Sequence, residues 1–185
     1  MPTLSLTHRL IPADFLTHSY RIVGEIRVSS AGLMGLINDP TTTYLDIQNA
    51  RLARIYMPNK LLECFQLLRL VKKQVLAVCL TRREDIGPQA QARMGFARVT
   101  SFPVFLSTSV YELSGTLEWA GRFDFSAIIT EGPREFIPLY EASLRASLIP
   151  SVIIEAPALV FNRGFVEALG LIEQRCNEEA DETPS

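Results

Sequence analysis

One unit occurs twice in this sequence, and no other feature constrains the fold as strongly. Residues 20–78 align with residues 111–169 at an offset of 91 or 92 positions, and the apolar positions coincide along most of their length. A repeat of this length indicates two copies of one supersecondary unit. Units this small bury only a modest core. We therefore expect the copies to pack against each other or against a partner chain.

A period of two predicts a strand at the start of each copy. Residues 20–28 and 111–119 alternate between apolar and polar side chains, as strands with one buried face do. Gly24 and Gly115 fall on the buried side of these strands. A strand glycine marks a sharp bend or the close approach of another backbone, so we interpret both as bends of a small barrel.

Helical spacing and turn residues predict the middle and the end of each copy. Apolar residues at i, i+3 and i+4 predict a short helix at Leu33 to Ile37 and another at Phe125 to Ile129. The pattern predicts that a hairpin closes each unit, with its turn at residues 72–73 in the first copy and 162–164 in the second.

The strand after the helix changes the parity of its apolar positions partway. This happens in both residues 44–56 and residues 136–148. Such a switch requires an extra residue, which predicts a bulge or tight turn near Asn49 and near Glu141. Pro138 cannot donate a backbone hydrogen bond, which favours an edge position for its strand.

These patterns predict an all-β fold of two tandem small barrel-like repeats. Each repeat has four or five strands and one short helix, and the two pack with pseudo-two-fold symmetry, as a fused homodimer would. Residues 1–80 form the first β repeat with an N-terminal arm, and residues 81–102 form a polar connector. Residues 103–172 form the second β repeat, and residues 173–185 form an acidic disordered tail.

The second copy resembles a small uncharacterised bacterial domain. Its segments Phe136-Ile-Pro-Leu-Tyr-Glu-Ala142 and Leu159-Val-Phe-Asn-Arg-Gly-Phe-Val166 are similar to the F-I-P-L-x-x-A strand and the V-x-N-R hairpin of that family. The first copy departs from both motifs, with Tyr44-Leu-Asp-Ile47 and Val71-Lys72 at the corresponding positions. The resemblance implies the same fold, and the family carries no established activity to transfer.

The formal net charge of −2 conceals an opposition between the two copies. Residues 20–80 carry 8 basic and 4 acidic side chains, whereas residues 111–170 carry 4 basic and 8 acidic ones. Opposed charges of this kind steer association, within the chain or between chains. Two solvated faces that diverged in charge are the alternative interpretation.

No residue pattern indicates catalysis. The sequence has no phosphate-binding glycine loop and no nucleophile elbow. Glu63 and Glu155 occupy the same place in each copy, but a solvated glutamate is the default interpretation of both. His8 and His18 are the two histidines, and we expect ordinary surface roles for them. We expect no catalytic residue, cofactor or metal.

The remaining features favour a cytoplasmic protein with reduced thiols. Cys64, Cys79 and Cys176 are widely spaced and form neither a disulfide framework nor a metal-ligand pair. The N-terminus lacks the apolar core of a secretory signal. No apolar run approaches the roughly 18 residues that a membrane span requires, so we expect no membrane association.

Three functions stay open at this point. The first is a non-enzymatic interaction or regulatory module of the bacterial cytoplasm that binds a protein partner or itself. The second is a nucleic-acid-binding small barrel that uses the basic first repeat, through Arg51, Arg54, Arg69, Lys72 and Lys73. The third is a small-molecule binder or enzyme with a cleft between the repeats.

Overall fold

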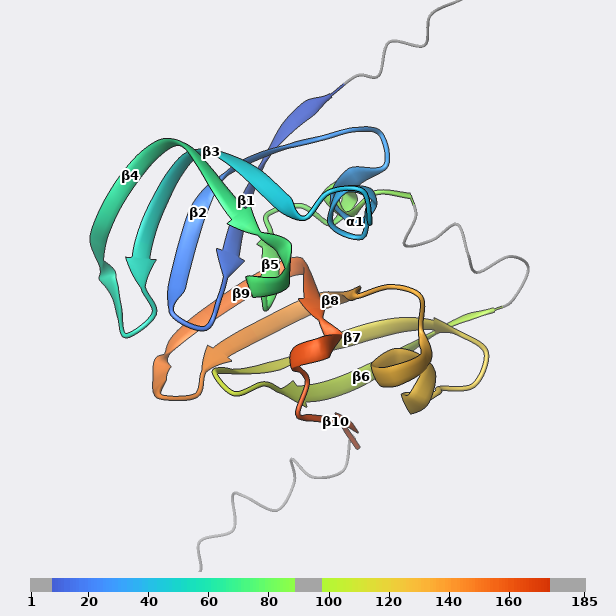
Figure 1. The fold of residues 1–185 in the computed structure, drawn as a ribbon. Coiled ribbons are helices and arrows are strands. Elements are labelled where there is room, and N and C mark those ends of the chain that lie inside the picture. Colours follow the sequence, from blue (N-terminus) through green and yellow to red (C-terminus); the bar gives the residue numbers. More distant parts are fainter. Residues whose placement is uncertain (1–7, 89–97, 174–185) are drawn as a thin grey trace, which may run out of the picture.

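The computed structural model describes residues 8–88 and 98–173 and is built almost entirely of strands (Figure 1). The strands are β1 (Arg9–Leu16), β2 (Tyr20–Val28), β3 (Tyr44–Arg54), β4 (Met57–Val71), β5 (Ala77–Leu80), β6 (Val99–Ser107), β7 (Tyr111–Ala120), β8 (Phe136–Ala146), β9 (Ile149–Asn162) and β10 (Ala168–Leu171). The short helical elements are α1 (Gly32–Ile37), the 3₁₀ turns η1 (Lys72–Gln74), η2 (Arg83–Ile86) and η5 (Arg163–Phe165), and the π-helix η4 (Ala127–Glu131). The all-β prediction is confirmed.

All ten strands form one antiparallel sheet in the order β10-β6-β7-β8-β9-β5-β1-β2-β3-β4. The sheet is open, and β4 and β10 are its two edges (Figure 1). The strands thus join into one sheet where we expected two separate barrel-like units. The barrel-like form of each repeat and the pseudo-two-fold symmetry stay predictions.

The same succession of elements occurs in residues 9–80, the first half, and in residues 99–171, the second half. In both halves a threonine closes the turn of the first hairpin. Thr17 Oγ1 accepts from the backbone N–H of Tyr20 at 3.0 Å, and Thr108 Oγ1 accepts from the N–H of Tyr111 at 3.0 Å. The offset of 91 between these contacts is the offset found in the sequence.

Strands β1 and β6 were missed by the sequence analysis. In β1 the side chains of Ile11, Ala13 and Phe15 are buried in alternation, whereas this segment was predicted to belong to an N-terminal arm. Strand β6 begins at Val99, inside the range assigned to the polar connector. The predicted acidic tail lies outside the described residues, apart from residue 173.

The predicted closing hairpins are wrong. Strand β4 pairs with β3, and the chain then turns through η1, so that β5 lies between β1 and β9. All four residues of β5 are buried, which an edge position would not allow. Strand β8 as a whole does not have the edge position predicted from Pro138, because it lies between β7 and β9, but at Pro138 itself its β7 side is unpaired. The ladder between β7 and β8 ends at Tyr140, so the absent N–H of Pro138 breaks no pairing with β7.

The predicted bulges are confirmed. Asn49 and Glu141 have positive φ angles of 49° and 45°, and the neighbouring ladders shift register at Gly24 and at Gly115. A Cβ atom on Gly24 would lie 2.6 Å from Cγ2 of Ile47. The two glycines therefore allow a close backbone approach at the bulges.

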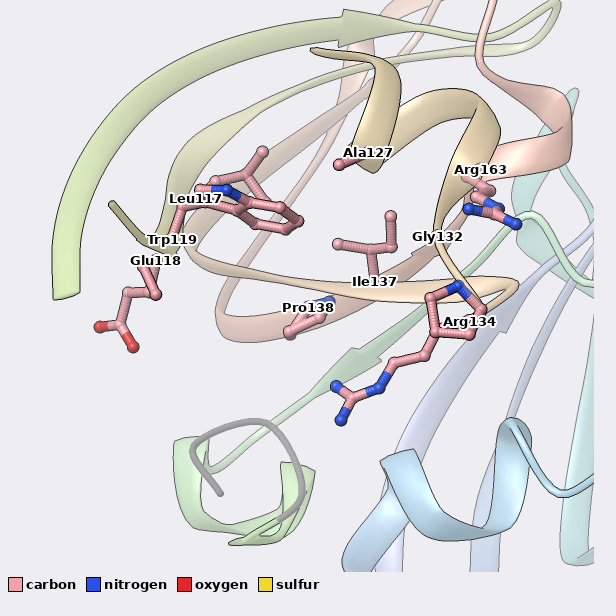
Figure 2. A pocket seen from close by; sticks show the side chains of 11 residues that line it. Leu117, Glu118, Trp119, Ala127, Gly132, Arg134, Ile137, Pro138 and Arg163 are labelled. Carbon is pink, nitrogen blue, oxygen red and sulfur yellow. The ribbon is translucent and has the colours of Figure 1, made fainter. Parts of the chain in front are cut away.

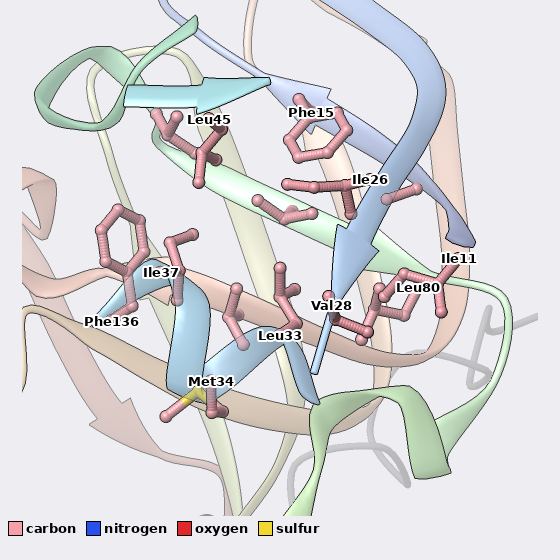
Figure 3. Packing of buried hydrophobic residues seen from close by; sticks show 14 of the residues in the cluster. Ile11, Phe15, Ile26, Val28, Leu33, Met34, Ile37, Leu45, Leu80 and Phe136 are labelled. Carbon is pink, nitrogen blue, oxygen red and sulfur yellow. The ribbon is translucent and has the colours of Figure 1, made fainter. Parts of the chain in front are cut away.

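Two hydrophobic cores lie on opposite faces of the sheet where β5 pairs with β9. Core 1 contains Val78 and Leu80 of β5, with residues of β1, β2, β3, β8, β9 and α1 around them (Figure 3). Core 2 contains Ala77 and Cys79 of β5, with residues of β6, β7, β8 and β9. Each half therefore completes its core with side chains from the other half.

Gly24→Ala should destabilise the protein by about 1–3 kcal/mol, because the new methyl group would overlap Ile47 and force the bulge to move. Gly170→Ala is the matched control, since nothing lies within 4 Å of a Cβ at that position, and we expect a change below about 0.5 kcal/mol. Urea denaturation measures both. Equal free energies of unfolding for the two variants would contradict the close approach.

Candidate functional site

Lys72, one of the five basic residues predicted to bind nucleic acid or a partner, is buried. Its side chain is 5% exposed, and its Nζ donates to the carbonyl oxygens of Leu36 and Asp39 at 2.7 and 2.9 Å and to Oγ1 of Thr42 at 2.7 Å. Burial lowers the pKa of this amine. These hydrogen bonds link the segment between α1 and β3 to the end of β4. In this structure the ammonium group of Lys72 does not reach a partner.

The other four basic residues are exposed, and they do not form one cluster. Arg51 and Arg69 lie on the outer face of the β3–β4 pair, Arg54 ends β3, and Lys73 lies in η1. Arg69 is already engaged. Its Nε donates to Asp46 at 2.9 Å and its guanidinium lies 3.9 Å from the ring centroid of Tyr44. This pairing reduces the charge that the surface offers to a phosphate.

Apolar side chains share this surface. We call Tyr44, Leu67, Arg69 and Val71 the β4 face. Leu67 is 57% exposed, Val71 is 49% exposed, and Tyr44 is also exposed. Contiguous exposed apolar side chains on a soluble protein mark sites of interaction. Further exposed apolar residues follow towards the β3–β4 turn, at Tyr56, Met57, Leu61 and Leu62.

The backbone beside the β4 face is as important as its side chains. The N–H of Lys72 donates to Thr43 next to β3, and successive residues of a strand point their backbone groups to opposite sides. The N–H and C=O groups of Leu67, Arg69 and Val71 therefore face away from β3. We call this row the β4 edge, and no strand among residues 8–88 and 98–173 pairs with it.

Strand β9 shows how the corresponding edge of the second half is paired. It is the fourth strand of the second half, as β4 is of the first. Its residues 158–162 are buried and pair with β5, and the N–H of Asn162 donates to Leu76 at 2.8 Å. The corresponding segment of β4 has no proline, and its one charge, Arg69, is paired with Asp46. Natural proteins protect exposed edges by prolines, charges or a cover, so this edge is unusually accessible.

The sequence analysis did not single out the β4 face. Tyr44 aligns with Phe136, which favoured a packing role for it, and Leu67 and Val71 fell within a predicted hairpin strand. The available signal was a difference between the copies. Leu67 and Arg69 stand where the second copy has Ala158 and Val160, and those two residues are buried.

A pocket of about 270 Å³ lies within the second half, between β7, η4 and β8. Figure 2 shows Trp119, Ile137 and Pro138 around it. Glu118, which lines the pocket, forms an ion pair with Arg83. Nη1 of Arg163 is buried and has no hydrogen-bond partner among the described residues. The pocket lies within one half, whereas the sequence interpretation placed a cleft between the repeats.

Buried and partly buried polar residues lie beside β5, near the joint between the halves, and make structural contacts. Asp14 and Arg21 form an ion pair at 2.6 Å, and the hydroxyl of Tyr111 donates to the carbonyl of Thr17 at 3.3 Å. Burial raises the pKa of the Asp14 carboxyl and of the Tyr111 hydroxyl, and it raises that of the Cys79 thiol above its ordinary range. A thiol that stays protonated is a poor nucleophile.

Glu63 and Glu155, which the repeat aligns, lie far apart in the sheet. Glu63 lies on β4 and Glu155 on β9, with β5, β1, β2 and β3 between them in the sheet. The ring of His18 packs edge-on against Phe165. Within the described part of the chain no group of three His, Cys, Asp or Glu residues could hold a metal ion, and no helix there is long and apolar enough to cross a membrane. Cys176 lies outside the described residues.

Lys72→Met should cost about 1–3 kcal/mol of stability, because three hydrogen bonds to partly buried acceptors are lost. Lys73→Met, the matched control at an exposed neighbouring position, should change stability by less than about 0.5 kcal/mol. Urea denaturation at neutral pH compares the two. Equal losses would contradict the buried role of Lys72.

The pH dependence gives a second readout. The pKa of Lys72 lies below its ordinary value of 10.5, so between the two values the unfolded chain binds more protons than the folded one. Stability should therefore include a component that rises with pH towards 10.5. Lys72→Met should remove this component and Lys73→Met should keep it. If the rise of stability with pH persisted in Lys72→Met, it would come from another titratable group.

Comparison with known proteins identifies no relative. No family model, no curated protein sequence and no solved structure matches the chain.

Proposed function

We propose that this chain is a non-enzymatic protein-interaction module of the bacterial cytoplasm, and that it binds its partner along the β4 edge. The observation that carries the proposal is the contrast between β4 and β9. Both are fourth strands of their halves, but β9 is covered by β5 whereas β4 exposes its backbone beside Leu67 and Val71. An extended segment that adds to such an edge gains main-chain hydrogen bonds for affinity and side-chain contacts for specificity.

The chemistry of the β4 face indicates what the partner segment looks like. Leu67, Val71 and Tyr44 offer apolar contacts, and Arg51 and Lys73 add positive charge around them. A complementary segment is extended, carries apolar side chains on the face that meets Leu67, and has acidic residues near Lys73. Electrostatic complementarity of this kind favours correct partners and raises the association rate.

Nucleic-acid binding is less well supported by the same surface. Lys72 is buried and Arg69 is paired with Asp46, so two of the five basic residues that suggested it are committed to the fold. Single-stranded nucleic acids require a continuous basic groove with stacking aromatics, and the ring of Tyr44 already carries Arg69 on one face. We therefore treat nucleic-acid binding as an outcome of the test below.

Leu67→Lys should abolish partner binding while leaving the fold intact. A lysine on an exposed edge is a device by which natural proteins prevent strand addition, and Leu67 is too exposed to contribute much to stability. The measurement is affinity capture from native lysate with and without nuclease, quantified by mass spectrometry. Leu148→Lys, the same substitution at an exposed residue outside the β4 face, is the matched control.

The added positive charge separates the two functions. A protein captured by the wild type and by Leu148→Lys, retained after nuclease and lost with Leu67→Lys, supports the interaction module. Nucleic acid captured equally or more strongly by Leu67→Lys, with affinity that falls steeply as salt rises, would overturn the proposal in favour of nucleic-acid binding.

A further inference from the structure

We infer that the segment that fills the β4 edge is strand β10 of a second copy of this chain, paired in the register that β5 and β9 use within one copy. The inference rests on the proposed role of the β4 edge and names its occupant. It follows from three observations: the place of β10 in the second half, the place of β4 in the first half, and the chemistry of the two edges.

Strand β10 is placed in the second half as β5 is in the first. Ala77 lies opposite Leu16 of β1, and Ala168 lies opposite Ser107 of β6. The residue before each strand makes the same backbone contact. The N–H of Leu76 donates to Leu16 at 2.8 Å, and that of Glu167 donates to Ser107 at 2.8 Å. β10 is therefore prepared to pair on its second side as β5 does.

Strand β4 is placed in the first half as β9 is in the second. Leu70 lies opposite Leu45 of β3, and Phe161 lies opposite Ile137 of β8. The residue after each strand donates its N–H to the carbonyl of the residue just before the neighbouring strand. Lys72 donates to Thr43 at 2.9 Å, and Arg163 donates to Glu135 at 3.0 Å. The same backbone groups thus face outward on both strands.

The register between copies follows from the one seen within the chain. Ala77 pairs with Phe161 and Leu80 pairs with Ala158. Moving each strand to its counterpart by the common offset of 91 places Ala168 opposite Leu70 and Leu171 opposite Leu67. The backbone groups of Leu67, Arg69 and Val71 then meet those of the β10 strand.

The side chains at the two edges suit this pairing. Leu171 is 43% exposed and the following Ile172 is similarly exposed, so pairing Leu171 with Leu67 covers apolar surface on both strands. Directly opposed apolar side chains stabilise a strand pair. The second side of β10 pairs with no strand among the described residues.

Charge favours this pairing over the alternative of two β4 edges. In the transferred register Glu167 lies opposite Val71, two residues from the exposed Lys73. The halves that carry the two edges also differ in charge, with an excess of basic residues in the first and of acidic residues in the second. Two β4 edges would instead bring like charges together, which disfavours the wrong pairing.

The contact joins two different surfaces, so it is heterologous and repeats from copy to copy. Two copies that exchange both contacts form a closed dimer, and otherwise the assembly grows at both ends. The β5–β9 ladder within the chain is four residue pairs long, and an interface based on so short a ladder is weak. We therefore expect association that increases with protein concentration.

Cysteine cross-linking between single variants tests the register. Leu67→Cys and Leu171→Cys are prepared in a background with Cys64→Ser and Cys176→Ser, given different tags, mixed, and oxidised with glutathione disulfide, which accepts the two electrons. Opposed residues of a hydrogen-bonded antiparallel pair have Cα atoms about 5.5 Å apart, within the range of disulfides. The expected product is a mixed covalent dimer, formed about fivefold more than with Leu169→Cys, which lies two residues out of register.

Sedimentation velocity tests the assembly without cysteines. The mean mass of the wild type and of Leu148→Lys should rise with concentration, and Leu67→Lys should stay monomeric. Thermal unfolding of each variant verifies that it is folded. Monomeric wild type at every concentration, or cross-linking dominated by Leu67→Cys with itself, would overturn the inference.

The two proposals fail separately. If the wild type is monomeric but Leu67→Lys still loses a protein captured from lysate, the β4 edge binds a different protein and only the further inference falls. If the wild type neither associates nor loses a partner through Leu67→Lys, both proposals fall.

Discussion

The pairing of β5 with β9 is the contact on which the rest of the structure depends. It joins two halves into one sheet, and its residues point alternately into core 1 and core 2. Neither half has a complete core alone, since Phe136 and Val160 of the second half lie in core 1 and Leu16 of the first half packs in core 2. Asn38 strengthens the joint from α1, because its side-chain amide exchanges two hydrogen bonds with the backbone of Phe136, at 2.9 and 3.1 Å.

The same pairing makes two similar halves unequal. It uses the last strand of the first half and the fourth strand of the second, so their counterparts, β10 and β4, are left at the edges of the sheet. Within the chain β9 pairs with β5, whereas β4 has no strand beyond it among the described residues. This difference explains why Leu67 is exposed and its counterpart Ala158 is buried. We propose that the β4 edge is the functional surface, and that the opposite charges of the halves direct which segment pairs with it.

Periodicity predicted the parts of the fold that depend on local pattern. The strand at residues 20–28, the helix from Leu33 to Ile37 and the bulges at Asn49 and Glu141 each leave a mark on neighbouring residues. No such local pattern predicts which strand pairs with β5. Its four consecutive buried residues have no period and can pair with any strand that needs cover. Lys72 and Lys73 look alike in the sequence, and only the carbonyl groups contributed by the segment after α1 decide that the first is buried. The β4 edge escaped prediction for the same reason, since exposure of an edge is a property of the whole sheet.

Hydrogen exchange of the β4 amides in dilute protein tests the central claim most directly. Leu68 and Leu70 face β3 and should exchange slowly, whereas Leu67, Arg69 and Val71 face the open edge and should exchange quickly. Asn162 and Val160, the counterparts of Val71 and Arg69 in β9, should both be protected by β5. An alternation between fast and slow amides along β4, absent from β9, is the predicted result. Uniform protection of residues 67–71 in monomeric protein would show that this edge is already filled and would contradict the account.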